Sequence, residues 1–399
     1  MLTRSLANLT PARDVDVLMD LTPRCNIYCT MCLLPLEEDH SKGTEMPDVV
    51  FERIANEVFP RAKSVSLSCG AEPFMSKRFL PALETAVARG VPNVRFVTNG
   101  LLMTDEAIEQ IVDLGINRVM VSLDGATAAT YESIRVGGKF DRLVERLESL
   151  KRIKQARGSR TPVLKFSWVL MRSNLDEVPE LIELAHRVGA DEVYLRHLVP
   201  FAELDVASQL VFDTPHIVNR VLDEAWSRAR RYGIRMTTLP KLPPGRPTLG
   251  QLFTLGFEQA REIARDEGLG GVLAVALRKW RLRHKACDQP WFSIYIRPDG
   301  SLNPCGAWFK EAPLGNLGEQ PLAAILASDD AQRLRAELTG LAPLRSACAQ
   351  CPNVVSGRVN PHAFKPRSAW ASGRPADWKP RVPKILERAR KRTQPGAPA

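Results

Sequence analysis

The sequence VDVLMDLTPRCNIYCTMC, residues 15–32, joins a short apolar segment to three closely spaced cysteines. Val and Leu dominate its first seven residues, which is typical of a buried β-strand. Cys25, Cys29 and Cys32 follow with C-x3-C-x2-C spacing, in the loop where that strand ends. Three thiolates this close can each bind one iron of a cubane, whereas a closed zinc site needs four ligands. The spacing predicts a cluster with one iron left open, and the alternatives are a zinc site with a distant fourth ligand or unrelated core thiols.

Beyond these cysteines, short β-branched runs alternate with amphipathic stretches. We expect strands at residues 15–21, 65–68, 94–98, 118–123, 164–170 and 192–197, with helices at about 48–59, 76–89, 105–114, 141–157 and 176–188. Four of these helices are followed by a glycine, which often ends a helix in a left-handed conformation: Gly90, Gly115, Gly158 and Gly189. Repeats of this kind predict parallel strands in a partial barrel or an open doubly wound sheet, with the site at the C-terminal strand ends.

Composition limits the function classes. The chain has 399 residues, of which 44% are apolar, so it is neither wholly disordered nor fibrous. It contains no long apolar run and no apolar signal segment near the N-terminus, so we expect a cytoplasmic protein without a membrane span. In that compartment the eight cysteines indicate metal or redox chemistry rather than disulfides.

The cysteine loop and the motifs after the next strands resemble the radical S-adenosylmethionine (SAM) superfamily. Its hallmark is a C-x3-C-x2-C loop after the first strand of a partial (β/α)6 barrel. The resemblance implies a TIM-like α/β fold and a [4Fe–4S] cluster bound by Cys25, Cys29 and Cys32, whose open iron binds SAM.

The resemblance also implies a set of SAM contacts. The family's Gly-Gly-Glu-Pro motif, which receives the SAM ammonium group, corresponds to Gly70, Ala71, Glu72 and Pro73 after the second strand. Met31 stands where the family has an aromatic residue next to the adenine. The remaining implied contacts are Thr98 and Asn99 at the ribose, Asp124 after the fourth strand, and Ser122 and Arg135 at the SAM carboxylate.

Four further cysteines lie in the C-terminal third of the chain: Cys287, Cys305, Cys348 and Cys351. Asp299 and Gly300 lie between two short apolar runs, 293–297 and 301–303, which predicts a β-hairpin. Four thiolates can close a zinc site or ligate a second cubane, and composition does not separate the two. The spacing is similar to the twitch and SPASM auxiliary-cluster modules, which implies one auxiliary [4Fe–4S] cluster bound by these four cysteines.

We divide the chain into five segments. They are an N-terminal extension at 1–14, a radical SAM core domain at 15–235, a linker and helical insert at 236–285, a small hairpin-and-helix auxiliary-cluster domain at 286–360, and a basic, disordered tail at 361–399. The tail accounts for most of the net charge of +10, because ten Lys and Arg face only two Asp and Glu after residue 362. The rest of the chain is therefore nearly neutral, so we expect no membrane partner and regard nucleic acid as an unlikely one.

The resemblance implies reductive cleavage of SAM to a 5′-deoxyadenosyl radical, which takes a hydrogen atom from a substrate carbon, with a flavodoxin or ferredoxin as reductant. We expect a small polyol, sugar or secondary-metabolite intermediate to be oxidised, with the auxiliary cluster accepting the electron. The core strand starts near residue 15 and leaves no room for an N-terminal leader-peptide-binding domain, which favours a small molecule. One alternative is a peptide- or protein-modifying SPASM-type maturase, and a second is a non-catalytic metal-binding protein that contacts nucleic acid through its tail.

Spacing alone names no general base. His197, at the end of a predicted strand, is a weak catalytic candidate because it is the histidine best placed to reach a substrate. Arg196, Glu203 and Asp205 lie near the same rim and are equally weak candidates. Cys69 falls outside both cysteine groups, and we expect it to be a small buried residue.

Overall fold

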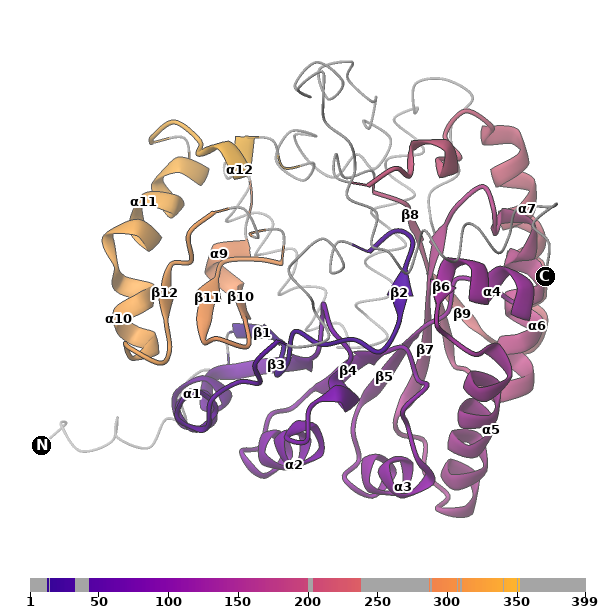
Figure 1. Ribbon diagram of the computed structural model, residues 1–399, viewed down its shortest axis with the longest axis horizontal. Coiled ribbons are helices and arrows are strands. Elements are labelled where there is room, and N and C mark those ends of the chain that lie inside the picture. The colour runs from indigo at the N-terminus through magenta and orange to yellow at the C-terminus, as the bar shows by residue number, and fades with distance from the viewer. Residues whose placement is uncertain are drawn as a thin grey trace, which may run out of the picture.

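A computed structural model of the chain (Figure 1) describes residues 13, 15–32, 43–199, 204–237, 287, 289–306, 308, 311–339, 341–349 and 351. The expected helical insert at about 240–285, the basic tail from residue 361 and Glu203 lie outside the described residues.

Ten strands form one sheet, in the order β12-β11-β10-β1-β3-β4-β5-β7-β8-β9. From β10 to β9 each neighbouring pair is parallel, and the β10–β11–β12 end is antiparallel. The strands are β1 (Val15–Met19), β3 (Ala62–Leu67), β4 (Val94–Thr98), β5 (Arg118–Ser122), β7 (Val163–Leu170), β8 (Glu192–His197), β9 (Arg235–Thr237), β10 (Ser293–Ile296), β11 (Ser301–Asn303) and β12 (Gly315–Asn316). A second, two-stranded sheet pairs β2 (Tyr28–Cys29) with β6 (Arg135–Val136).

Helices cover the outer face of the curved sheet (Figure 1). They are α1 (Asp48–Arg53), α2 (Phe79–Ala88), α3 (Asp105–Asp113), α4 (Ala128–Ile134), α5 (Phe140–Ala156), α6 (Val178–Val188), α7 (Pro215–Tyr232), α9 (Gln289–Phe292), α10 (Leu322–Ala327), α11 (Asp329–Leu338) and α12 (Ser346–Ala349). None of the helices in the described ranges is both long enough and apolar enough to cross a bilayer.

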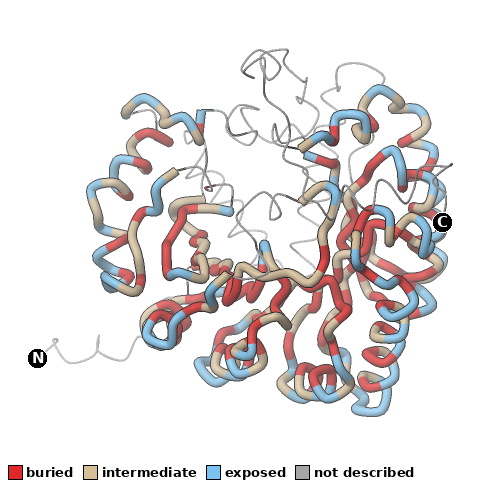
Figure 2. Tube along the Cα trace, in the orientation of Figure 1, coloured by how far each residue is buried: buried red, intermediate tan, exposed pale blue. Residues whose placement is uncertain are grey.

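The alternation of side chains along the strands separates two faces of the sheet. Val94, Phe96 and Thr98 of β4 are at most 2% exposed, and Phe96 packs edge-to-face on Phe79 of α2 with ring centroids 5.0 Å apart. The intervening residues Arg95 and Val97 point to the opposite, concave side. Figure 2 shows buried strands between the concave side and helices whose outer surfaces are exposed. The helix-facing residues therefore form the core, and the concave residues line the space available for a ligand.

Most of the predicted elements are confirmed. The six predicted strands and the five crossover helices occur within a few residues of the expected positions. Gly90, Gly115, Gly158 and Gly189 all have φ between 58° and 72°, as expected for residues that end helices. The hairpin forms at Asp299 and Gly300, where Gly300 has φ 86°.

Three features go beyond the expectation. Residues 322–338 form two helices, because Ser328 leaves the helical conformation and its side chain caps α11 by accepting from the N–H of Ala331. An additional strand, β9, follows α7. Finally, the predicted C-terminal hairpin is not a separate sheet, because β10 pairs in parallel with β1 from Asp16 and Ser293 to Met19 and Ile296.

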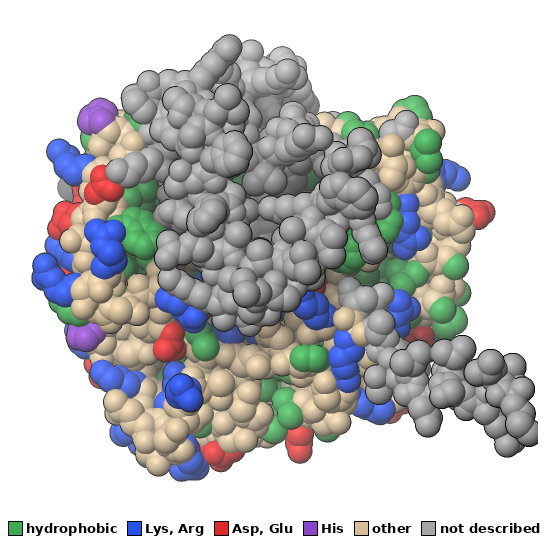
Figure 3. Space-filling model, turned by 180° about the vertical axis from the view of Figure 1, so that it is seen from behind, with side chains coloured by type: hydrophobic (Ala, Val, Ile, Leu, Met, Phe, Trp, Pro, Cys, Tyr) green, Lys and Arg blue, Asp and Glu red, His purple; other side chains and the backbone are tan. Residues whose placement is uncertain are grey.

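The surface carries no concentrated charge on the face opposite to that of Figure 1. Lys and Arg side chains there are spread among Asp, Glu and uncharged residues (Figure 3). A nucleic-acid-binding surface would present a continuous basic stripe, and the described residues visible on this face form none.

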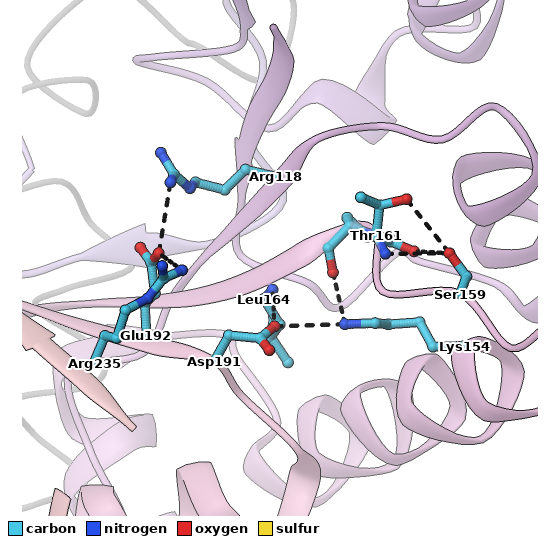
Figure 4. A network of polar contacts seen from close by, with 9 residues as sticks. Arg118, Lys154, Ser159, Thr161, Leu164, Asp191, Glu192 and Arg235 are labelled. Atoms are coloured by element: carbon cyan, nitrogen blue, oxygen red, sulfur yellow. Dashed lines mark hydrogen bonds and ion pairs between the residues drawn. The ribbon is translucent and has the colours of Figure 1, made fainter. Parts of the chain in front are cut away.

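Glu192 joins four strands at their N-terminal ends (Figure 4). Its side chain is 8% exposed and forms ion pairs with Lys165 at 3.3 Å, with Arg118 at 3.5 Å and with Arg235. These cations come from β7 and β9, which flank β8, and from β5, the next strand beyond β7. Next to this cluster, Asp191 accepts from the backbone N–H of Leu164 at 2.8 Å. Ion pairs thus link these four strands at their N-terminal ends.

Replacing this buried carboxylate should destabilise the fold. In Glu192→Gln the side chain keeps its shape but loses the negative charge that pairs with Lys165, Arg118 and Arg235, so we expect the free energy of unfolding to fall by about 2 kcal/mol. Urea denaturation followed by circular dichroism measures the change. The matched control is Glu148→Gln, which removes an exposed carboxylate 3.9 Å from Arg187 and should change stability by less than about 0.5 kcal/mol. Equal effects of the two substitutions on the free energy of unfolding would show that the ion pairs of Glu192 do not stabilise the fold.

Candidate functional site

The loop with the first three cysteines is tied to the end of α4. Cys29 pairs with Arg135 in the small β2–β6 sheet, and the N–H of Thr30 donates to the carbonyl of Ile134 at 2.9 Å. Strands of two residues leave no periodic pattern, so this contact could not be predicted from the sequence. It places residues far apart in the chain at one site.

Arg135 is a buried cation beside a cysteine. It is 7% exposed, and its Nη1 lies 3.5 Å from Sγ of Cys29. Its Nη2 donates to Oδ2 of Asp124 at 2.5 Å, and its Nε donates to the carbonyl of Leu123 at 2.9 Å. Burial alone lowers the pKa of Arg135, but the Asp124 carboxylate more than offsets this and raises it above the ordinary value. The guanidinium therefore keeps its positive charge next to the thiol.

Asp124 supports Arg135 rather than lining open space. It is fully buried and has φ 64°, a rare conformation for a non-glycine residue. While its Oδ2 accepts from Arg135, its Oδ1 accepts from the backbone N–H of Val169 at 2.6 Å. Both carboxylate oxygens are used inside the protein, although the resemblance implied a cofactor contact for Asp124.

Glu72 connects the ends of β3 and β4. It is 1% exposed, and its carboxylate accepts from the hydroxyl of Thr98 and the backbone N–H of Asn99, both at 2.7 Å. It also accepts from the N–H of Phe74 at 3.3 Å. Burial raises the pKa of Glu72 to about 7, although these hydrogen bonds act in the opposite direction. Two of the implied SAM-binding motifs, at residues 70–73 and 98–99, are thus one hydrogen-bonded unit.

Asn99 extends this unit to the cysteine loop. Its Nδ2 donates to Oδ1 of Asn26 at 2.8 Å and lies 3.9 Å from Sγ of Cys25. Its Oδ1 accepts from the N–H of Leu101 at 3.0 Å, which fixes the orientation of the amide. The structure therefore brings the cysteine loop and the motifs after β3, β4 and β5 together, as expected for C-terminal strand ends.

The burial and charge around the three cysteines suit a bound iron–sulfur cluster. Cys25, Cys29 and Cys32 are all partly exposed, and the N–H of Cys32 donates to the carbonyl of Cys29 at 3.1 Å. Burial raises the pKa of the Cys25 thiol to about 11, so a thiolate there requires positive charge nearby, which iron supplies. The hydroxyl of Tyr131 is fully buried without a hydrogen-bond partner among the described residues, and its charged neighbours include Arg135 and Cys29.

Other predicted residues lie in less direct positions. Gly70 is exposed, Ala71 and Ser122 are half-buried and Pro73 is buried. Met31 packs against a small apolar cluster that includes Ile134 and Met171.

Two expectations about single residues change. Cys69, expected to be buried, is exposed, because the chain turns after β3 with Ser68 at φ 75°. His197 has the same orientation along β8 as the buried Val193 and Leu195, and its ring lies 4.8 Å from that of Phe212. It therefore packs on the helix-facing side rather than toward the concave space.

Arg196, one of the three rim candidates, lies on the concave side, because it precedes His197 and successive residues of a strand point to opposite faces. Its guanidinium is 5.7 Å from the ring centre of Tyr194. Asp205 is exposed. Neither residue contacts the cysteine loop or Glu72 in the described part of the structure.

The four C-terminal cysteines gather in one region. Cys348 is buried, and burial together with the neighbouring Cys305, Cys287 and Cys351 raises its pKa to about 12. The N–H of Cys351 donates to the carbonyl of Cys348 at 3.2 Å. Among the residues that the structure describes, however, no three possible ligands are close enough to share one metal ion.

Comparison with known proteins agrees with this geometry. Residues 19–185 match the model of the radical SAM superfamily, and residues 287–352 match SPASM, an iron–sulfur cluster-binding domain. The AdoMet-dependent heme synthase of Methanosarcina barkeri is 24% identical over 340 residues, which cover 83% of this chain and 89% of that protein. The PqqA peptide cyclase of Granulibacter bethesdensis is 25% identical over 295 residues, covering 73% and 68%.

Among solved structures, the chain resembles Streptococcus suis SuiB with a TM-score of 0.59 and 16% identity, covering 86% of this chain and 72% of that one. At this identity the likeness shows the fold, a mostly parallel α/β sheet with a small C-terminal domain.

The two groups of cysteines should differ in their effect on SAM cleavage. Replacing Cys25, Cys29 or Cys32 by Ala should remove the open iron and abolish 5′-deoxyadenosine formation, with a loss of about four irons per chain. Cys348→Ala should keep some SAM cleavage but lose product. Iron analysis and chromatography of 5′-deoxyadenosine measure both effects. Cys69→Ala should keep the full iron content, and identical behaviour of the two groups would contradict this division.

SAM affinity should depend on the ionisation of Glu72. The pKa of about 7 means that the carboxylate takes up a proton as the pH falls from about 8 to about 6. Because a neutral carboxyl attracts the SAM ammonium less strongly, the affinity should decrease over this range. Glu72→Gln should bind SAM about tenfold more weakly at pH 8 and lose the pH dependence. The exposed Glu84→Gln on α2 is the control, and anaerobic titration calorimetry gives the affinities. A pH-dependent affinity in Glu72→Gln would exclude this role.

Proposed function

We propose a substrate class for this chain, which is a radical SAM enzyme with a C-terminal SPASM iron–sulfur domain: it modifies a residue of a peptide or protein. The match to a peptide cyclase over 295 residues carries the proposal. This match, like the match to the heme synthase, is much longer than the radical SAM segment at residues 19–185, so the likeness is not limited to the part that all radical SAM enzymes share.

This proposal replaces our expectation of a small polyol or sugar. That expectation depended on the position of the first strand and on the presence of four auxiliary cysteines. Neither observation identifies a substrate, because both describe how the chain is organised rather than what the concave side contacts. The relatives favour the first of our two alternatives, a SPASM-type maturase.

When bound, the cluster and SAM supply the electron and the 5′-deoxyadenosyl radical that removes hydrogen from a substrate carbon. We assign the three cysteines after β1 to the cluster and the linked Glu72, Thr98 and Asn99 unit to SAM. Arg135 holds positive charge beside Cys29, where it stabilises anionic sulfur. The helix-covered outer face excludes water from behind the site.

The auxiliary domain is held directly against the core, and this supports a role in electron transfer. The hairpin strand β10 lies between Cys287 and Cys305 and pairs with β1, the strand that leads into the first cysteine loop. We assign the four C-terminal cysteines to an auxiliary cluster that accepts the electron left on the substrate. A flavodoxin or ferredoxin remains our proposed reductant.

The concave wall favours one second candidate. Its side chains include more cations than carboxylates, in contrast to the apolar layers that usually fill such barrels. By strand alternation, its charged residues are Arg95, Arg118, Lys165, Arg196, Arg235 and Arg297, against Asp16, Asp20 and Glu192. Arg118, Lys165 and Arg235 already pair with Glu192, so the cations that an anionic macrocycle could contact are Arg95, Arg196 and Arg297. The heme synthase match covers 83% of the chain. A tetrapyrrole carboxylate is therefore the second candidate, and an acidic peptide is compatible with the first.

Substrate-dependent SAM cleavage tests the proposal. The fully reconstituted enzyme is incubated anaerobically with SAM and dithionite, and with one of three probes. The probes are short peptides encoded beside its gene, a porphyrin tetracarboxylate, and myo-inositol. A peptide should raise 5′-deoxyadenosine formation at least about tenfold, or about 1.4 kcal/mol in the barrier, and should change in mass by loss of hydrogen. Stimulation by the porphyrin alone would establish the second candidate, and stimulation by myo-inositol alone would overturn both.

A further inference from the structure

A tyrosine of the C-terminal hairpin contacts an aspartate at the end of the first core strand. Tyr295 lies on β10, and its hydroxyl donates to Oδ2 of Asp20 at 2.5 Å. Asp20 follows β1 and is 3% exposed. The backbone N–H of Asp20 also donates to the carbonyl of Ile296 at 3.1 Å. Strand β10 therefore holds Asp20 through both its backbone and its side chain.

The same carboxylate holds the loop that leads to Glu72. Oδ1 of Asp20 accepts from the backbone N–H of Cys69 at 2.7 Å. The N–H of Gly70 lies 3.2 Å from each of the two oxygens. Cys69 and Gly70 begin the loop after β3 that we assign to SAM. Asp20 is thus the link between the C-terminal hairpin and that loop.

The loop is tight enough to need such an anchor. Ser68 has φ 75°, a conformation that disfavours non-glycine residues, and its hydroxyl donates to the carbonyl of Ala71 at 2.5 Å. A Cβ atom on Gly70 would lie 3.3 Å from Oδ2 of Asp20 and 3.7 Å from the hydroxyl of Tyr295. The backbone of Gly70 therefore packs directly on the Asp20–Tyr295 pair, and strained segments of this kind persist only where neighbours hold them.

Burial makes the Asp20 carboxylate dependent on its donors. Desolvation raises the pKa of Asp20, and the hydrogen bonds from Tyr295, Cys69 and Gly70 lower it. Without the Tyr295 hydroxyl, the Oδ2 atom would keep only the longer contact with Gly70 among these donors. A buried anion that loses a donor is destabilised. The hydrogen bonds that it accepts from the N–H groups of Cys69 and Gly70 then position the loop less firmly.

We propose that Tyr295 is a positioning residue for SAM, which acts through Asp20 on the amides of Cys69 and Gly70. The C-terminal domain thereby sets the geometry of the SAM-binding loop in the core. Because β10 lies between Cys287 and Cys305, a disturbance of the auxiliary cluster reaches the loop by the same path, and SAM binding stabilises the hairpin in return. The proposal depends on SAM binding by this loop and not on the peptide substrate, so its test contains no substrate.

The experiment uses Tyr295→Phe with both clusters reconstituted. We expect the Kd for SAM to rise about tenfold, equivalent to about 1.4 kcal/mol. At saturating SAM, the dithionite-driven rate of 5′-deoxyadenosine formation should stay within about twofold of the wild-type rate. The electron paramagnetic resonance spectrum of the core cluster without SAM should not change. A purely structural loss would instead lower iron content or thermal stability and leave the Kd of the loaded protein unchanged.

Two further variants make the result specific. Asp20→Asn should weaken SAM binding to a similar extent. The double variant should bind SAM no more weakly than the single variant with the lower affinity, because both substitutions act through the same hydrogen bond. The control is Tyr232→Phe, which removes a surface hydroxyl 2.7 Å from Glu183 and should leave the Kd unchanged. Wild-type SAM affinity in Tyr295→Phe, or additive effects in the double variant, would overturn the proposal.

Discussion

The hydrogen bonding of β1 on both of its edges is the constraint on which the rest of the structure depends. On one side it pairs with β3, the strand that leads to the Cys69–Pro73 loop, and on the other with β10 of the C-terminal hairpin. The first cysteine loop follows β1 itself. Three segments that are distant in the sequence therefore end side by side. The parallel pairing of these three neighbouring strands is therefore enough to bring the segments together at one site.

Charged groups buried around the site have specific partners, and these partners connect its parts. Arg135 is held by Asp124, Glu72 by donors from the next strand, and Asp20 by donors from the loop and the hairpin. Each pair joins two different strand ends. Burial makes an unpaired charge unfavourable, so the same hydrogen bonds that satisfy these groups also fix the relative positions of the loops.

Much of the fold could be predicted from local pattern. Strand and helix periods, and the glycines after helices, depend on neighbouring residues only, which is why Gly90 and Gly189 were placed correctly. The cysteine spacing likewise indicated the cluster loops. Contacts that depend on which strands become neighbours leave no local pattern, and the pairing of β10 with β1 and the Asp20–Tyr295 bond belong to this group. His197 shows a related limit, because the direction of a strand-end side chain depends on the strand's exact register.

The ends of the sheet restrict how a peptide can be recognised. The outermost strands in the described structure are β12, with two residues, and β9, with three. Short edge strands protect a sheet against unwanted pairing with other chains. They also offer too little free backbone for a peptide to join as an added strand, the mode in which main-chain hydrogen bonds supply most of the affinity. For the peptide substrate that we propose, the described edge strands therefore favour selection by side-chain chemistry on the concave wall, where charge and shape, rather than strand-forming tendency, decide which peptides are accepted.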